Sequence, residues 1–195
     1  MPTPKVLVFA GSTRRDAYSR RVANAVVLLL EAAGGKVTQV NLADFDMPIY
    51  NGDHEAAVGL PTSVRKLQLL IAEHDALLIA TPEYNGSMTP LLVNTLDWCS
   101  RPDQASPATS GTGIFADKPA ALLASSPGPL GGMRSLFHLR DLLGYLGMIV
   151  IPQQLAIGKA HEAFAEDGRL ADKKQEAVLA GVAKALVMAT GKLRG

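Results

Sequence analysis

KVLVFAGSTRRDAYS, residues 5–19, is the stretch of the chain that decides its fold. Residues 5–10 form a short apolar run that ends at Gly11, a pattern typical of a buried strand. From residue 17 to residue 33 apolar side chains recur at helical spacing, until a pair of glycines ends the helix. Residues 11–19 are therefore predicted to form a loop that joins a buried strand to the N-terminus of a helix.

The same order of strand and helix repeats along the rest of the chain. Further strands are predicted at residues 36–42, 75–81 and 118–125, and residues 148–151 are predicted to begin a fifth strand. Further helices are predicted at 61–73, 89–99, 133–146 and 172–190, with irregular loops at 45–59 and 101–117. Strands that alternate with helices predict an α/β fold with a parallel sheet and helices on both faces. Five strands favour the flavodoxin-like order 2-1-3-4-5 over the six-stranded dinucleotide-binding order.

Composition narrows the class of protein. The 195 residues, 48% hydrophobic and 19% charged, suit one domain over residues 1–195, and neither linker nor repeat divides them. A net charge of +1 lacks the basic excess of a nucleic-acid binder. No apolar run is long enough to span a membrane and no signal-peptide pattern opens the chain, so we expect a cytoplasmic protein. The four histidines lack metal-ligand spacing and Cys99 has no cysteine partner, so we expect neither a metal site nor a disulfide.

The strand order predicts where a ligand binds. In open α/β sheets, ligands lie beyond the carboxyl ends of the strands, at the point where the strand order reverses. For the flavodoxin-like order this point lies between the first and third strands. The loops at residues 11–19 and 82–89 should therefore face each other across the site, with the loop at 125–132 beside them.

The first of these loops has the chemistry of an anion site. The N-terminus of a helix offers unpaired N–H groups and a positive dipole end. Hydroxyls of Ser12, Thr13 and Ser19 can donate hydrogen bonds, and the guanidinium of Arg14 can pair with phosphate oxygens. The loop lacks the second glycine and the lysine of a P-loop, which favours a monophosphate over a triphosphate. The alternative is a helix capped by a hydroxyl, with solvated arginines.

The other two loops can enclose a flat ring. Tyr84 offers an aromatic face, and Asn85, next to Gly86 in a turn signal, can both donate and accept hydrogen bonds. The glycines of residues 125–132 allow the backbone to approach a ligand closely. Taken singly, each loop is equally consistent with an ordinary turn. Their predicted position at one edge of the sheet favours a binding site.

Several motifs together resemble one family, the NAD(P)H-dependent FMN reductases of flavodoxin-like fold. They are GSTR at 11–14, TPEYNGS at 81–87, NTLDW at 94–98, SPGPLGGMR with HLR within 126–140, and AFAEDGRL at 163–170. The resemblance implies FMN as the cofactor, with its phosphate on Ser12, Arg14 and Ser19. It implies that the isoalloxazine ring lies against Pro82, Glu83, Tyr84, Asn85 and Gly86, and that its other edge borders Ser125, Ser126 and Gly128.

The resemblance also implies an activity. Such an enzyme passes electrons from NADH or NADPH through FMN to a small acceptor (a quinone, free flavin, azo compound or metal oxyanion) by ping-pong hydride transfer. Its chemistry takes place at flavin N5, without a catalytic side chain. Homodimers or homotetramers are implied as well. Ala17, Ser19 and Val93 depart from the family pattern, which often has Ser, Asn and Lys there. A flavodoxin-type electron carrier and a catalytically silent flavin-binding protein are the alternatives.

Overall fold

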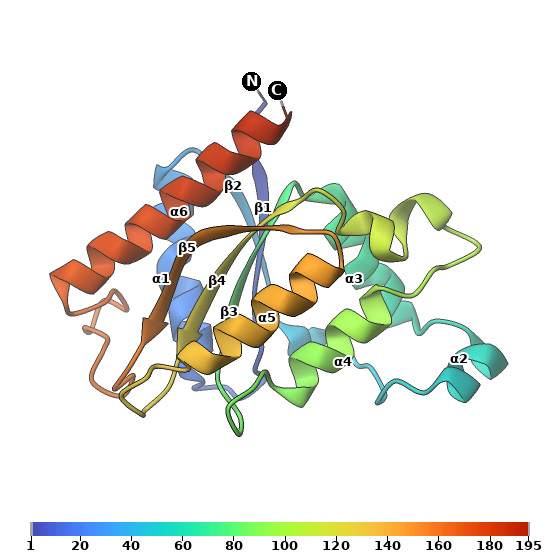
Figure 1. The fold of residues 1–195 in the computed structure, drawn as a ribbon, viewed down its shortest axis with the longest axis horizontal. Helices are drawn as coiled ribbons and strands as arrows, with labels where there is room; N and C mark the ends of the chain where they lie inside the picture. Colours follow the sequence, from blue (N-terminus) through green and yellow to red (C-terminus); the bar gives the residue numbers. More distant parts are fainter. Residues whose placement is uncertain (1, 195) are drawn as a thin grey trace.

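The computed structural model describes residues 2–194 and contains one five-stranded sheet (Figure 1). The strand order is β2-β1-β3-β4-β5 and every pairing is parallel, which confirms the predicted fold class. The strands are β1 (Lys5–Ala10), β2 (Lys36–Val40), β3 (Ala76–Thr81), β4 (Pro119–Ser125) and β5 (Ile149–Ile157). The helices are α1 (Tyr18–Ala32), α2 (Gly52–Val58), α3 (Thr62–Glu73), α4 (Pro90–Cys99), α5 (Met133–Tyr145) and α6 (Lys173–Arg194).

The three central strands owe their place to their composition. All residues of β3 and β4 are buried, and in β1 only Lys5 is exposed. Uninterrupted apolar strands of this kind are stable only where helices cover both faces of a sheet. The two outer strands are more polar, and β5 contains Pro152, which is tolerated at an edge because no further strand needs its missing N–H. Composition thus sorts the strands between centre and edge.

Two helical layers cover the sheet (Figure 1). The apolar faces of α1 and α6 pack on one side, in a core that includes Val26, Leu30 and Leu186. The other side is covered by α3, α4 and α5, with a core that includes Leu67, Leu96 and Leu139. Both termini lie at the amino end of β1 in Figure 1, opposite the edge where the strands end. At that edge, where the strands end, the loops that follow β1, β3 and β4 begin.

Two predicted loops contain regular structure. Residues 45–59 include α2, so the prediction of an irregular loop there was wrong. Its start is capped by Asn51, whose side-chain oxygen accepts from the N–H groups of Asp53 and His54. The Asn51-Gly52 pair therefore caps a helix instead of making a turn. The stretch 101–117 includes two short 3₁₀ turns, Pro107–Thr109 and Thr112–Ile114.

The segment that carries α2 is held to α4 by side-chain hydrogen bonds. Trp98 donates from Nε1 to the carbonyl of Pro48 (2.8 Å), and Asn94 donates from Nδ2 to the same carbonyl (2.9 Å). The amide of Tyr50 donates to Oδ1 of Asn94 (2.7 Å). Trp98 is fully buried, and its indole forms part of this anchor.

Replacing Trp98 should loosen this segment. In Trp98→Phe the bond to Pro48 is lost and space opens beside α4, so we expect the free energy of unfolding to fall by about 1–2 kcal/mol. Proteolytic cleavage within residues 46–59 should become faster under native conditions, as followed by mass spectrometry. The control is Tyr145→Phe, which removes a hydroxyl from a ring that is 87% exposed. Equal cleavage rates in wild type and Trp98→Phe would contradict the role of this anchor.

No helix within residues 2–194 has the length and apolar character needed to cross a membrane.

Candidate functional site

A cavity of about 270 Å³ opens at the carboxyl ends of β1, β3 and β4. The three loops that follow these strands supply its walls, as the strand order predicted. Eleven residues line it: Ser12, Arg14, Ala17, Tyr18, Ser19, Pro82, Glu83, Tyr84, Ser125, Ser126 and Pro127. Sequence analysis did not name Ala17, Tyr18 or Pro127 as binding residues, although each adjoins one that it named.

One end of the cavity is the first turn of α1. The N-cap of this helix is Ala17, which makes no side-chain cap, so the alternative of a hydroxyl-capped helix is wrong. Ser19 lies inside the helix, and its Oγ is buried without a hydrogen-bond partner among the described residues. A buried hydroxyl without a partner costs free energy unless a ligand satisfies it. The helix end and this hydroxyl together suit an anionic ligand.

Ser12 and Arg14 complete this end of the cavity. The Oγ of Ser12 accepts from the amide of Arg14 at 3.3 Å, which closes a tight turn directly after β1. Arg14 is exposed, and its guanidinium carbon lies 5.8 Å from the centre of the Tyr18 ring. An exposed guanidinium at the rim of the cavity can pair with a phosphate while it remains partly hydrated.

Ser125, on the loop side of β4, is a second lining residue with a buried hydroxyl that is unpartnered in the described part of the chain. Ser125 is the last residue of β4 and is only 2% exposed. Its Oγ has no hydrogen-bond partner among the described residues. Its neighbour Ser126, in contrast, forms two hydrogen bonds within the protein. Its amide donates to the carbonyl of Ile157 (3.1 Å), and its Oγ accepts from the amide of Gly128 (3.2 Å). The hydroxyl of Ser125 is thus free to bond a polar edge of a ligand.

The loop after β4 is held against β5 by close backbone packing. A Cβ at Gly131, where φ is +63°, would lie 2.6 Å from the amide nitrogen of Gly158. A Cβ at Gly158 would lie 2.4 Å from the carbonyl oxygen of Pro129. Only glycine allows this approach, so the position of Ser125 and Ser126 is rigidly set.

The loop after β3 is a two-residue turn. Tyr84 and Ser87 exchange two backbone hydrogen bonds of 3.0 Å each, and Asn85 and Gly86 have φ of +51° and +79°. An Asn-Gly pair is favoured at such positions because both residues must adopt a positive φ. Asn85 and Gly86 therefore form the tip of the turn and do not line the cavity, and Gly128 does not line it either. The ring of Tyr84 does line it and is 51% exposed.

Glu83 has a partner that the sequence did not reveal. Its carboxylate accepts from the amide of Arg134 (3.0 Å) and from the Nε of the same residue (2.9 Å), and Nη2 lies 2.6 Å away. The amide of Ser135 also donates to it, at 3.4 Å. Arg134 is therefore engaged in an ion pair and is not simply a solvated residue on the surface of α5. Glu83 joins the loop after β3 to the N-terminus of α5, where a carboxylate is favoured by the helix dipole.

These contacts determine the charge state of Glu83. Burial raises the pKa of its carboxyl, but the hydrogen bonds and positive charge of Arg134, with the two backbone amides, outweigh burial and hold the pKa below its ordinary value of 4.5. Glu83 is therefore a stable carboxylate near neutral pH and does not serve as a proton donor there.

The cavity fits the flavin mononucleotide that the sequence led us to expect. The first turn of α1 and Ser19 offer donors to a phosphate, Tyr84 offers an aromatic surface, and Ser125 adds a hydroxyl without a partner among the described residues. The two buried hydroxyls lack protein partners, as expected where a bound polar molecule supplies them.

The ion pair of Glu83 predicts a pH-dependent stability. Because the folded-state pKa lies below the unfolded one, the pair stabilises the fold above about pH 4.5, and this contribution is lost as pH falls through the folded pKa. Glu83→Gln should therefore reduce the free energy of unfolding by about 1–2 kcal/mol at pH 7, and by less at pH 4. Denaturant titration of the flavin-free protein at both pH values measures the difference.

The matched control for this measurement is Glu31→Gln on the exposed surface of α1, which has no ion pair in the described part of the chain. Its effect should be small and the same at both pH values. An equal loss at pH 7 and pH 4 in Glu83→Gln would show that the carboxylate does not act through its charge.

Comparison with known proteins identifies the family to which the chain belongs. Residues 4–162 match the model of the family described as NADPH-dependent FMN reductase. The chain is 35% identical over 193 residues to an NAD(P)H-dependent FMN reductase of Pseudomonas aeruginosa, covering 98% of this chain and 97% of the relative. A quinone reductase of Escherichia coli is 33% identical over 148 residues, 75% of this chain and 73% of the relative.

A solved structure agrees with the sequence relatives. FerB, an NAD(P)H:(acceptor) oxidoreductase of Paracoccus denitrificans, superposes with a TM-score of 0.81 at 30% identity, covering 97% of this chain and 98% of that one. The match of the family model spans the three loops of the cavity, and the Pseudomonas aeruginosa relative matches nearly the whole chain. The chain therefore belongs to the family of NADPH-dependent FMN reductases.

Proposed function

We propose that this protein is an NAD(P)H-dependent oxidoreductase that binds FMN in the cavity between the loops after β1, β3 and β4. When bound, FMN accepts a hydride from a reduced nicotinamide and delivers the electrons to a second substrate. The observation that carries the proposal is that Ser19 and Ser125, whose buried hydroxyls have no hydrogen-bond partner among the described residues, both line this cavity.

The residues of the first loop hold the phosphate. Ser19 donates its hydroxyl, and the first amides of α1 add their N–H groups and the positive end of the helix dipole. Arg14 pairs with the phosphate from the rim, and Ser12 shapes the turn that presents it. Ala17 supplies no hydroxyl, so fewer side-chain donors reach the phosphate than in relatives with Ser there.

The other two loops position the ring. Pro82 and Tyr84 provide the surface against which it lies, while Asn85 and Gly86 form the turn that presents Tyr84. Ser125 and Ser126 face the opposite edge, with Gly128 behind them. Glu83 acts on the ring indirectly, because its carboxylate fastens the loop after β3 to α5.

The protein contributes orientation and electrostatics, and no side chain needs to take up a proton. The cavity of about 270 Å³ is small compared with ligand sites of roughly 300–1,000 Å³. The nicotinamide and the acceptor therefore use the same face of the ring in turn, which is a ping-pong scheme. The acceptor is a small molecule, such as a quinone, a free flavin, an azo compound or a metal oxyanion.

Two further features belong to the proposal. The net charge of +1 opposes the role of a flavodoxin-type carrier, because carriers are usually strongly acidic.

The outward face of α5 exposes Phe137 (53%) and Tyr145 (87%), which suits a homo-oligomer. We place this homo-oligomer in the cytoplasm, with residues 1–195 as a single flavin-binding domain.

Reconstitution with FMN tests the activity and the role of Ser19 together. The wild type should oxidise NADH or NADPH with a quinone or a free flavin as acceptor. In Ser19→Ala the dissociation constant for FMN should rise about tenfold, because a hydrogen bond to a charged group is lost. The flavin-free variant should unfold no more easily than the wild type, because the lost hydroxyl has no protein partner. Fluorescence titration and thermal unfolding measure these two effects.

The control is Thr62→Ala, which removes an exposed hydroxyl from the first turn of another helix, α3, outside the flavin cavity. Its affinity for FMN should match the wild type. Tight FMN binding without turnover of either dinucleotide would favour the carrier or the silent binding protein. Absence of FMN binding would refute the proposed function altogether.

A further inference from the structure

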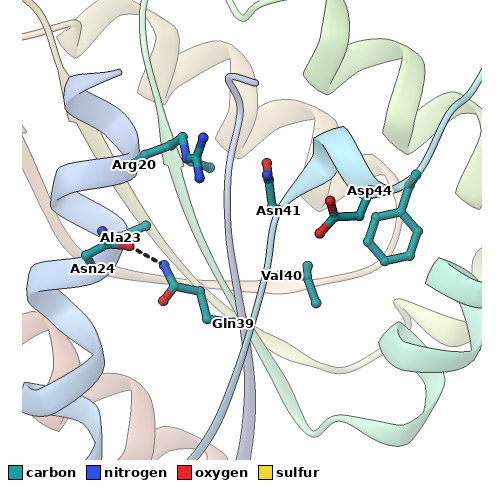
Figure 2. A pocket seen from close by; sticks show the side chains of 9 residues that line it. Arg20, Ala23, Asn24, Gln39, Val40, Asn41 and Asp44 are labelled. Carbon is teal, nitrogen blue, oxygen red and sulfur yellow. Dashed lines mark hydrogen bonds between the residues drawn. The ribbon is translucent and has the colours of Figure 1, made fainter. Parts of the chain in front are cut away.

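A second cavity lies at the same edge of the sheet, beyond the end of β2. Figure 2 shows this cavity, of about 360 Å³, between the first two turns of α1 and the 3₁₀ turn η1 (Leu42–Asp44). Its lining is mostly polar: Arg20 and Asn24 come from α1, and Gln39, Asn41 and Asp44 from the end of β2 and from η1. The ring of Phe45 also lines it.

Arg20 is the only cationic side chain lining this cavity. The side chain is half-buried and, within residues 2–194, takes part in no salt bridge. In Figure 2 it extends from α1 towards Asn41, with Asp44 beyond it. A half-buried cation without an acidic partner is suited to an anionic ligand, because the ligand can replace lost hydration.

The remaining polar groups suit hydroxyls. Oδ1 of Asn41 accepts from the amide of Ala43 at 3.2 Å, which leaves its NH₂ group able to donate. Asp44 is exposed and offers acceptor oxygens. Gln39 and Asn24 are joined by a hydrogen bond of 2.7 Å and form the far wall.

This cavity adjoins the proposed flavin cavity. Ala10 lines the second cavity and Ser12, two residues later, lines the first. The consecutive residues Arg20 and Ser19 likewise line different cavities. The two sites are thus separated only by the loop after β1 and the first turn of α1. The short sequence distance between their lining residues makes the two cavities candidates for one elongated ligand.

A dinucleotide co-substrate needs such an extension. Its nicotinamide must reach the flavin, but a cavity of about 270 Å³ cannot also hold the adenosine half. A further cavity, beside Thr13, has Asp46 as its only charged lining residue and would repel a phosphate. Charge therefore favours the cavity that contains Arg20.

We propose that the cavity at the end of β2 binds the adenosine half of the NAD(P)H co-substrate, with Arg20 on a phosphate, Asn41 and Asp44 on ribose hydroxyls, and Phe45 against the adenine. The assignment rests on the proposed function, because it takes the flavin to lie in the neighbouring cavity. It makes Arg20 a binding residue that acts on the co-substrate alone.

Steady-state kinetics of Arg20→Ala tests the assignment. The KM for the dinucleotide that the wild type oxidises should rise about tenfold, with kcat and FMN affinity unchanged, because the lost contact serves binding and not the reacting atoms. A reduced nicotinamide with a benzyl group in place of its nucleotide should be oxidised by variant and wild type with equal kinetics. An equal loss with both donors would overturn the proposal.

Arg21→Ala is the matched control. It removes the same charge one position further along α1, where the guanidinium lies 4.2 Å from the centre of the Phe164 ring and outside the cavity. Its KM for the dinucleotide should stay within about twofold of the wild type, as expected when no direct contact is lost. A rise equal to that of Arg20→Ala would show a general charge effect and overturn the assignment.

Calorimetry with 5′-ADP tests the cavity independently of turnover. The FMN-loaded wild type should bind 5′-ADP, and Arg20→Ala should bind it about tenfold more weakly. This result separates the two proposals, because ADP binding persists even if no acceptor is reduced. FMN-loaded wild type that fails to bind 5′-ADP would overturn the inference while leaving the flavin site intact.

Discussion

Parallel pairing of β1 with β3, in a sheet buried on both faces, is the constraint on which the rest of this protein depends. Parallel strands require a crossover after each one, and here helices make the crossovers and cover the sheet. The chain leaves β1 towards β2 on one side and returns to β3 on the other, so the loops after β1 and β3 diverge and leave a space between them. Every group proposed to bind a ligand lies at this edge.

The binding edge is built at a cost to the flavin-free protein. Ser19 and Ser125 bury hydroxyls that find no partner among the described residues, and Gly131 and Gly158 bring two backbone segments into close contact. A buried hydroxyl without a partner lowers the stability of the fold unless a ligand forms a hydrogen bond with it. Burial of apolar side chains in the cores on the two faces of the sheet stabilises the fold and offsets this loss of free energy. Glu83 adds a local brace by tying the loop after β3 to α5.

Much of the fold was predictable because it follows from short-range patterns. Runs such as Ala76–Thr81 identify buried strands, and Gly34 and Gly35 end α1 as expected. The helix at Gly52–Val58 was missed because Asn51-Gly52 is also a turn signal and the segment buries no side chain. Helices without an apolar stripe give no periodic signal. The partners of Arg134 and Trp98 were missed for another reason: Glu83 and Pro48 are about 50 residues away in the chain.

The sequence by itself determined the α/β class, the strand order and the three loops of the candidate site, because alternation of apolar strands with amphipathic helices and loop composition are local properties. Only the tertiary structure decided that Ser19 points its hydroxyl into a cavity instead of capping α1, and that Asn85 and Gly86 form a turn tip. It alone revealed the second cavity, where Arg20 faces Asn41 and Asp44. Burial and the direction of a side chain depend on segments distant in sequence, which no local pattern encodes.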